Sequence, residues 1–160
     1  MKKIIYPGTF DPVTYGHIDI IQRASELFDS IVVTVAVNPS KSPLFSLEER
    51  LFLLKESLKD INNVVIDSFE GLTVDYAHKV GAIGILRGLR AISDFEYEFQ
   101  MALTNRKIAE NIETVFLMPG EKYSYISSTL VREIARYGGD VKDFVPVEAV
   151  KIIAGKYKKI

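Results

Sequence analysis

Thr14, Gly16 and His17 are the first residues whose types and spacing suggest chemistry, and they follow a short apolar run and a turn rich in glycine and proline. A strand, a turn and a helix opening on histidine predict an anion site, because a helix N-terminus presents unpaired N–H groups and a partial positive charge. Gly16 lets the backbone approach a ligand closely, and His17 can donate a ring N–H to an oxygen that gains charge during a reaction. An isolated motif of this kind also fits a helix-capping threonine followed by a surface histidine.

Cationic side chains occur in two further loops. Lys41 lies between two prolines, where a mobile ammonium could bridge two phosphate groups; a solvated loop lysine is the alternative. Arg87 and Arg90 follow an apolar run, and arginine offers the planar, permanently charged fork that phosphates favour. Two surface arginines paired with Asp94 or Glu96 would be the structural interpretation of the same pattern.

Composition and the missing motifs narrow the class of protein. The chain has 160 residues, no cysteine, two histidines and a formal net charge of -1, which excludes disulfides and thiol catalysis and gives no argument for a nucleic-acid or membrane partner. Neither G-x-G-x-x-G nor G-x-x-x-x-G-K-[ST] occurs. The longest apolar run, at 31–37, is too short to span a bilayer, and the first residues lack the apolar region of a signal peptide. We expect a soluble cytoplasmic protein.

Alternating strands and helices must position these residues. Strands are predicted at 4–6, 31–37, 64–66, 83–86 and 114–118, with helices at 16–28, from 47 onward, at 73–80 and from about 93 to 111. Ser46 and Glu49 form a capping box at the start of the second helix. On the fourth helix, Phe95 and Phe99 are expected to face the core.

This order predicts one α/β domain over residues 1–160, with a Rossmann-like, doubly wound, five-stranded parallel sheet and helices on both faces. Ligands bind such sheets beyond the carboxyl ends of the strands, where the strand order reverses. Loops 7–17, 38–45, 87–92 and 119–128 are expected to converge there on one crevice.

Several segments together resemble one family. They are YPGTFDP at 6–12 with T-x-G-H at 14–17, NPSK at 38–41, RGLR at 87–90, DFEYE at 94–98 and YISSTLVR at 125–132. In this order they resemble the bacterial phosphopantetheine adenylyltransferases, of the nucleotidyltransferase superfamily with the T/H-x-G-H motif. The resemblance implies transfer of AMP from ATP to 4′-phosphopantetheine, giving dephospho-coenzyme A and pyrophosphate, in a cytoplasmic homohexamer with possible feedback by coenzyme A.

The resemblance also implies roles for individual residues. The implied catalytic residues are Thr9, His17, Lys41 and Arg90, and the implied phosphopantetheine contacts are Thr9, Lys41, Thr73 and Arg87. The implied ATP contacts are Thr9, Phe10, His17, Gly88, Leu89, Arg90, Glu98, Tyr123, Ser124, Tyr125, Ile126, Ser127, Ser128 and Thr129. Mg²⁺ is expected to be carried mainly by ATP phosphates and water, with no protein metal ligands.

Some interpretations stay open at this point. Thr73 also fits a plain helix start, Glu98 a solvated helix position, and Asp11 a brace for its turn. Gly120 stands where family members often carry serine. Another transferase of the superfamily, acting on nicotinate mononucleotide or glycerol phosphate, is one alternative, and the Arg87 to Arg90 motif and the Lys41 loop argue against it. A nucleotide sensor without turnover is the other, and the presence of His17, Lys41, Arg87 and Arg90 together argues against that one.

Overall fold

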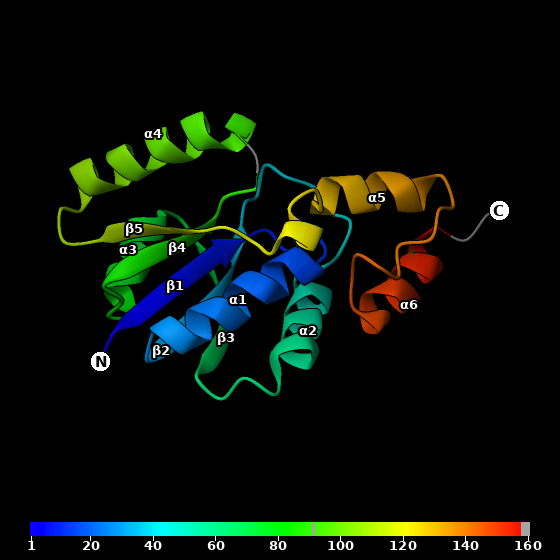
Figure 1. The fold of residues 1–160 in the computed structure, drawn as a ribbon, viewed down its shortest axis with the longest axis horizontal. Helices are drawn as coiled ribbons and strands as arrows, with labels where there is room; N and C mark the ends of the chain where they lie inside the picture. Colours follow the sequence, from blue (N-terminus) through cyan, green and yellow to red (C-terminus); the bar gives the residue numbers. More distant parts are fainter. Residues whose placement is uncertain (91, 158–160) are drawn as a thin grey trace.

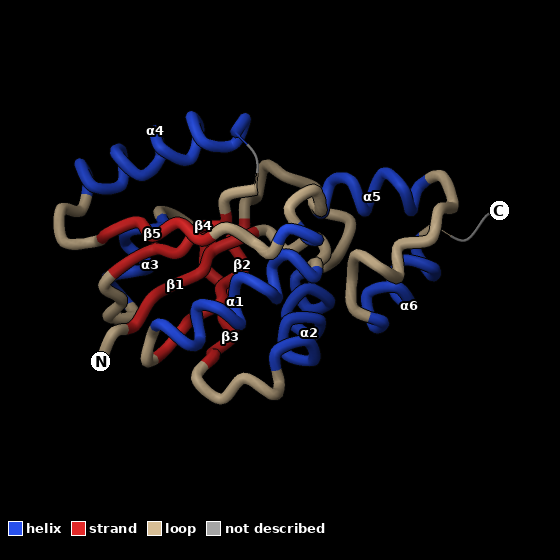
Figure 2. The backbone as a smooth tube through the Cα atoms, in the orientation of Figure 1, coloured by secondary structure: helices blue, strands red, loops and turns tan. Residues whose placement is uncertain are grey.

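The computed structural model describes residues 1–90 and 92–157, with the backbone alone at positions 92 and 93. Strands and helices alternate along most of the chain (Figures 1 and 2). The elements are β1 (Lys3–Gly8), α1 (Tyr15–Leu27), β2 (Ser30–Val37), α2 (Leu47–Leu58), β3 (Val64–Glu70), α3 (Thr73–Lys79), β4 (Gly84–Gly88), α4 (Ile92–Ile108), β5 (Glu113–Leu117), the short 3₁₀ helix η1 (Glu121–Tyr123), α5 (Ser128–Arg136) and α6 (Val147–Lys156).

The five strands form one parallel sheet in the order β3-β2-β1-β4-β5. The chain builds outward from β1 in one direction through β2 and β3, and then crosses to β4 and β5 on the other side of β1. The strand order therefore reverses between β1 and β4, and their carboxyl ends, Gly8 and Gly88, lie at the switch point where a ligand crevice is expected. The predicted α/β, Rossmann-like sheet is confirmed.

Alternate residues of the inner strands enter two separate hydrophobic clusters. Ile4 and Tyr6 pack with residues of α1 and α2, whereas Ile5 packs with residues of α3. On β2, Val33 and Val32 divide in the same way, so the β-branched run is covered on both faces, as predicted. Helices cover both faces of the sheet, and α5 and α6 lie beyond the carboxyl ends of the strands (Figure 1).

Local signals place the start of α2 but indicate only part of β3. The capping box of α2 is confirmed: Glu49 N–H donates to Ser46 Oγ (3.1 Å), and Ser46 N–H donates to Glu49 Oε2 (2.8 Å). β3 runs to Glu70, beyond the predicted 64–66; it is an edge strand on which half-buried and exposed residues alternate over 64–68, followed by the buried Phe69. The apolar residues reveal only the first half of such a strand.

The prediction for Phe95 and Phe99 is wrong. Their side chains are 47% and 49% exposed and stack on one another at a centroid distance of 5.6 Å. The inward face of α4 instead carries Glu98, which is buried, and the half-buried Ala102 and Asn105. The charged side chain of Glu98 can be buried because it pairs with Arg87. The buried face of α4 is therefore polar while the apolar Phe95 and Phe99 are exposed, the reverse of the pattern expected for a helix that packs on a sheet. Among the described helices, none is long and apolar enough to cross a membrane.

Candidate active site

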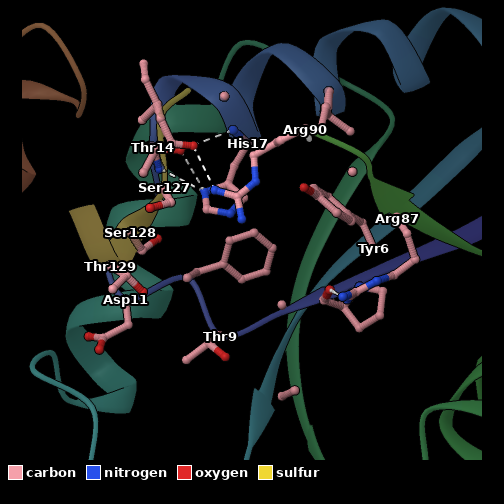
Figure 3. Close-up of a pocket in the computed structure, with 18 of the residues that line it drawn as sticks. Tyr6, Thr9, Asp11, Thr14, His17, Arg87, Arg90, Ser127, Ser128 and Thr129 are labelled. Carbon is pink, nitrogen blue, oxygen red and sulfur yellow. Dashed lines mark hydrogen bonds between the residues drawn. The ribbon is translucent and has the colours of Figure 1, made fainter. Parts of the chain in front are cut away.

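A cavity of about 750 Å³ opens at the carboxyl ends of β1 and β4 (Figure 3). All four predicted loops contribute to its wall. The predicted site residues that line it are Thr9, Phe10, His17, Lys41, Thr73, Arg87, Gly88, Arg90, Glu98, Ile126, Ser127, Ser128 and Thr129. Leu89, Tyr123, Ser124 and Tyr125 are not part of the lining, and their contact with ATP stays a prediction.

Thr14 and His17 form a reciprocal cap at the start of α1. His17 N–H donates to Thr14 Oγ1 (3.4 Å), and Thr14 N–H donates to Nδ1 of the imidazole (3.0 Å), with Thr14 Oγ1 also 3.0 Å from Nδ1. Because Nδ1 accepts a backbone N–H, the ring proton of the neutral imidazole must sit on Nε2. The capping threonine is thus confirmed, and the same contacts fix the tautomer of His17, whose role in the reaction stays a prediction.

The environment of His17 keeps the ring neutral. Burial, followed by the charges of Arg90 and Arg87, lowers the pKa of His17 from 6.5 to about 4. Since both arginines line the same cavity, their field disfavours a third positive charge there. At neutral pH, His17 is therefore an uncharged donor with its N–H on Nε2.

Phe10 packs against this imidazole from the loop after β1. Its ring lies edge-on to His17 at a centroid distance of 5.0 Å and edge-on to Tyr6 at 5.6 Å. The backbone of Phe10 has φ 48, a region that non-glycine residues rarely occupy. A Cβ at Gly8 would lie 2.9 Å from the Phe10 ring, so this turn requires glycine at position 8. The loop accepts an uncommon backbone geometry and thereby places a ring beside His17.

Arg87 is held in place before any ligand arrives. Its Nε and Nη2 donate to the two carboxylate oxygens of Glu98 at 2.9 and 2.6 Å, and Nη1 donates to the Pro7 carbonyl at 3.1 Å. Burial alone would lower the pKa of Arg87, but the bonded carboxylate of Glu98 outweighs it and raises the pKa. The partner of Arg87 is Glu98, and neither Asp94 nor Glu96. The side chain is still 35% exposed and can present an edge to the cavity.

Arg90 contacts the segment that leads into α5. Nη1 of Arg90 donates to the Ile126 carbonyl at 2.9 Å, and its Nε lies 3.8 Å from Asp94, the pairing that the structural interpretation expected. Ser127 caps α5 by accepting the Leu130 N–H, while Ser128 Oγ donates to the Pro12 carbonyl at 2.7 Å. The N-terminus of α5 is thereby fixed to the turn after β1, with its first N–H groups at the cavity.

Three further predicted residues of the lining, Thr9, Lys41 and Thr73, remain accessible to solvent. Thr9 and Lys41 are exposed, and among the described residues no carboxylate lies within ion-pair distance of the Lys41 ammonium. Thr73 is the first residue of α3, which confirms the helix start, and it also lines the cavity; its contact with phosphopantetheine stays a prediction. His78 is exposed and lies outside the lining.

Two arginines of this region escaped the sequence analysis. Arg132 lines the cavity and lies 3.5 Å from Asp11, and Arg50 is buried, with its Nη1 donating to the Thr9 carbonyl at 3.1 Å. Arg132 is one helical turn after Ser128, so its place on the cavity side of α5 could be read from the sequence once that serine was placed. Nothing in the sequence signals the long-range contact of Arg50.

The cavity as a whole suits a polyanion. Lys41, Arg87, Arg90 and Arg132 supply four cationic groups, against three carboxylates. Asp11 and Glu98 are already bonded to N–H groups of the protein. Among the described residues, no group of three or more acidic or histidine side chains could hold a metal ion. The carboxylate oxygens of Asp11 and Glu98 are therefore already occupied and do not offer free ligands to a divalent cation. In the loop at 119–128, Gly120 N–H donates to Asp19 Oδ2 at 2.7 Å. This contact anchors the loop to α1 through the backbone, so it does not require a side chain at position 120.

Comparisons with known proteins agree with this geometry. Residues 5–134 match the cytidylyltransferase-like family. A phosphopantetheine adenylyltransferase of Caldanaerobacter subterraneus is 57% identical over 99% of both chains. One of Dictyoglomus thermophilum is 61% identical over 91% of this chain and 89% of that one. A solved structure named as a nicotinate-nucleotide adenylyltransferase of Vibrio parahaemolyticus covers 100% of this chain and 98% of its own, with TM-score 0.74 and 21% identity, and so shares the fold. The chain belongs to the cytidylyltransferase-like family and, within it, to the phosphopantetheine adenylyltransferases.

Proposed function

We propose that this chain transfers the adenylyl group of ATP to 4′-phosphopantetheine, forming dephospho-coenzyme A and releasing pyrophosphate. The observation that carries the proposal is the convergence of the His17 cap, Lys41, Arg87, Arg90 and the α5 N-terminus on one cavity. The relatives at more than half sequence identity carry the name of this activity.

The reaction explains why the cavity needs donors and cations. An oxygen of the acceptor phosphate attacks the α-phosphorus of ATP in line, and the bond from that phosphorus to the pyrophosphate oxygen breaks. The acceptor is the nucleophile, so the protein has to position two polyanions and stabilise the negative charge that spreads over the α-phosphate. No side chain has to form a covalent bond.

His17 is suited to the developing charge. Its Nε2 carries the ring proton while Thr14 holds Nδ1, so the donor is oriented before the substrate binds. A neutral donor adds no cation to a site that already has arginines, and it strengthens its bond as the α-phosphate gains charge. We assign it to stabilisation of the transition state, with Thr9 bonding to phosphate beside it.

The other side chains divide between the two substrates in this proposal. Lys41 bridges the acceptor phosphate and the α-phosphate, Arg87 and Thr73 contact phosphopantetheine, and Arg90 contacts the ATP phosphates. Phe10, Gly88, Leu89, Glu98 and residues 123–129 complete the ATP side, with the N–H groups at the start of α5 facing the outer phosphates. Glu98 acts there through Arg87, because its carboxylate is occupied by that guanidinium.

Mg²⁺ is proposed to enter as the ATP complex. Phosphate oxygens and water supply most ligands of Mg²⁺ in many nucleotide sites, and two of the three carboxylates here, Asp11 and Glu98, are committed to protein donors. The ion would neutralise part of the triphosphate charge.

The test is product formation by the purified chain. With ATP, Mg²⁺ and 4′-phosphopantetheine, it should release pyrophosphate and form dephospho-coenzyme A, and His17→Ala should remain folded by circular dichroism while losing about 10² to 10³ in rate. Nicotinate mononucleotide and glycerol phosphate serve as competing acceptors. ATP binding without product from 4′-phosphopantetheine would overturn the proposal.

Three further properties are proposed with this function. Residues 1–160 form one nucleotidyltransferase domain, which predicts a single unfolding transition in urea. Its place is the cytoplasm, where ATP is supplied, and cell fractionation tests this. Coenzyme A, which shares chemical parts with both substrates, is expected to compete for the cavity and to act as a feedback inhibitor in the rate assay.

Self-association as a homohexamer completes the proposal. α4 exposes large apolar side chains in two groups: Phe95, Phe99 and Leu103 lie on one side of the helix, and Tyr97 and Met101 lie on the other. Exposed apolar surface of this extent is usually covered in a stable assembly. Light scattering should give a mass of six chains, and a monomer at micromolar concentration would contradict the assignment.

A further inference from the structure

Asp11 is a buried carboxylate whose two oxygens are both used by a segment distant in sequence. Its side chain is 5% exposed. Oδ2 accepts the Leu44 N–H at 3.0 Å, and Oδ1 accepts the Phe45 N–H at 2.8 Å. Figure 3 shows the Asp11 side chain directed away from His17. The residue therefore does more than brace its own turn, because it joins the loop after β1 to the segment before α2.

The segment that Asp11 holds is the end of the loop that carries Lys41. Residues 38–43, here called the Lys41 loop, are all exposed, and they begin directly after β2 ends at Val37. Within the loop, Lys41 N–H donates to the Asn38 carbonyl at 3.0 Å. The chain becomes buried again at Phe45, which is 0% exposed. The Lys41 loop is thus attached at one end to β2 and at the other, through Leu44 and Phe45, to the carboxylate of Asp11.

A carboxylate is the group that this attachment requires. It accepts two N–H bonds in parallel, whereas the carboxamide of an asparagine would turn its own NH₂ toward one of the two amides. The negative charge is also compensated locally, since Arg132 lies 3.5 Å from Asp11 and the charges of Asp11 and the buried Arg50 act on one another. The negative charge that holds the two N–H groups is therefore compensated by two arginines, Arg132 and Arg50.

We propose that Asp11 is a positioning residue for Lys41: by holding Leu44 and Phe45, it sets where the Lys41 loop crosses the cavity and where its ammonium meets the phosphates. This inference rests on the proposed function for the part that concerns catalysis. Lys41 is exposed on a loop without an ion-pair partner among the described residues, so its placement depends on the two ends of that loop. Displacement by about 1 Å can cost about 10² in rate.

A double-mutant cycle between Asp11 and Lys41 tests the catalytic part. Asp11→Asn alone should lower kcat by about 10- to 100-fold. In a Lys41→Met background, the same substitution should change kcat by less than about threefold, because an absent ammonium cannot be misplaced. Losses that multiply in the double variant would overturn the proposal.

Asp19 offers a matched control for this cycle. It too is an aspartate that accepts a loop N–H, from Gly120 at 2.7 Å, and pairs with an arginine, Arg23, at 3.0 Å. Its loop is on the ATP side of the cavity, so any effect of Asp19→Asn should multiply with that of Lys41→Met. Equal coupling of both aspartates to Lys41 would show that the coupling does not come from the attachment at Leu44 and Phe45, and would overturn the proposal.

Limited proteolysis tests the attachment independently of activity. Trypsin cleavage after Lys41, followed by mass spectrometry, should be several-fold faster in Asp11→Asn than in the wild type, while Asp19→Asn leaves it unchanged. An unchanged rate at Lys41 would overturn the attachment itself. If Asp11→Asn does not fold, Asp11→Glu serves in both experiments, because it keeps the negative charge that interacts with Arg50 and Arg132 while it displaces the two carboxylate oxygens. Should the wild type make no dephospho-coenzyme A, the proposed function fails, and cleavage still decides the attachment.

Discussion

The charge state of His17 can be tested on the protein without ligand. Burial and the arginines Arg90 and Arg87 bring its pKa to about 4. At pH 5.5, about 3% of His17 should then be protonated, compared with about 90% for an ordinary histidine. Replacing Arg90 by methionine removes one cause, so the pKa should rise toward 6.5 without reaching it, because burial is the larger cause.

The difference between the pKa of His17 in the folded and the unfolded chain makes the free energy of unfolding depend on pH between about 4 and 6.5. Since the folded pKa of about 4 is below the ordinary 6.5, the unfolded chain binds more protons between these two values. The free energy of unfolding therefore has its full His17 contribution above pH 6.5 and loses it as the pH falls through 4. At 1.36 kcal/mol per pH unit, the contribution is about 3 kcal/mol.

Nuclear magnetic resonance gives the decisive measurement. The chain has two histidines, so a His78→Gln variant assigns both ring Cε1–H signals at once. The His17 signal should show no titration between pH 7 and about 5.5. Rate profiles are a poorer choice, because phosphate groups of both substrates also titrate near pH 6. A His17 midpoint near 6.5 would refute the argument from burial and the arginine field.

Three substitutions test the packing and the caps by urea unfolding. A Cβ at Gly88 would lie 2.6 Å from Ile20 Cδ1, so Gly88→Ala should cost about 1–3 kcal/mol; Gly155→Ala, in helix α6 with no atom within 4 Å, is its control without a clash and should raise stability by about 0.5–1 kcal/mol. Ser46→Ala removes the cap of α2 and should cost about 1 kcal/mol. Glu98→Gln removes the charged partner of Arg87 and should cost about 2 kcal/mol. Equal stability of Gly88→Ala and Gly155→Ala, or no loss of stability in Ser46→Ala or Glu98→Gln, would contradict these assignments.

Local signals in the sequence were sufficient to predict the five strands and the first four helices of this fold. The β-branched run of β2 and the Ser46 and Glu49 box each depend on neighbours within a few residues, and both are confirmed. The position of the crevice follows from the strand order, which the alternation of strands and helices makes predictable. Most of the residues assigned by resemblance line it, although their roles stay predictions.

Contacts across the fold could not be predicted in this way. Whether Arg87 would meet Asp94, Glu96 or Glu98 depends on which face α4 turns inward, and the apolar pattern of that helix indicates the wrong one. The contact of Arg50 with Thr9 spans 41 residues and requires the packed positions of α2 and the loop after β1. Such contacts are consequences of tertiary packing, which sequence periodicity does not encode.

The cap at the start of α1 means that abundance and activity would diverge in a mutational scan of this chain. Position 17 is where a capping box usually carries glutamine or glutamate, whose side chains could also accept the Thr14 N–H. Variants with these residues should accumulate in cells like the wild type and yet fail to support growth that depends on the enzyme. A score based on protein level alone would rank position 17 as tolerant of substitution. Such a score detects only the role of Nδ1, which caps the helix, and misses Nε2, which is proposed to act in the reaction.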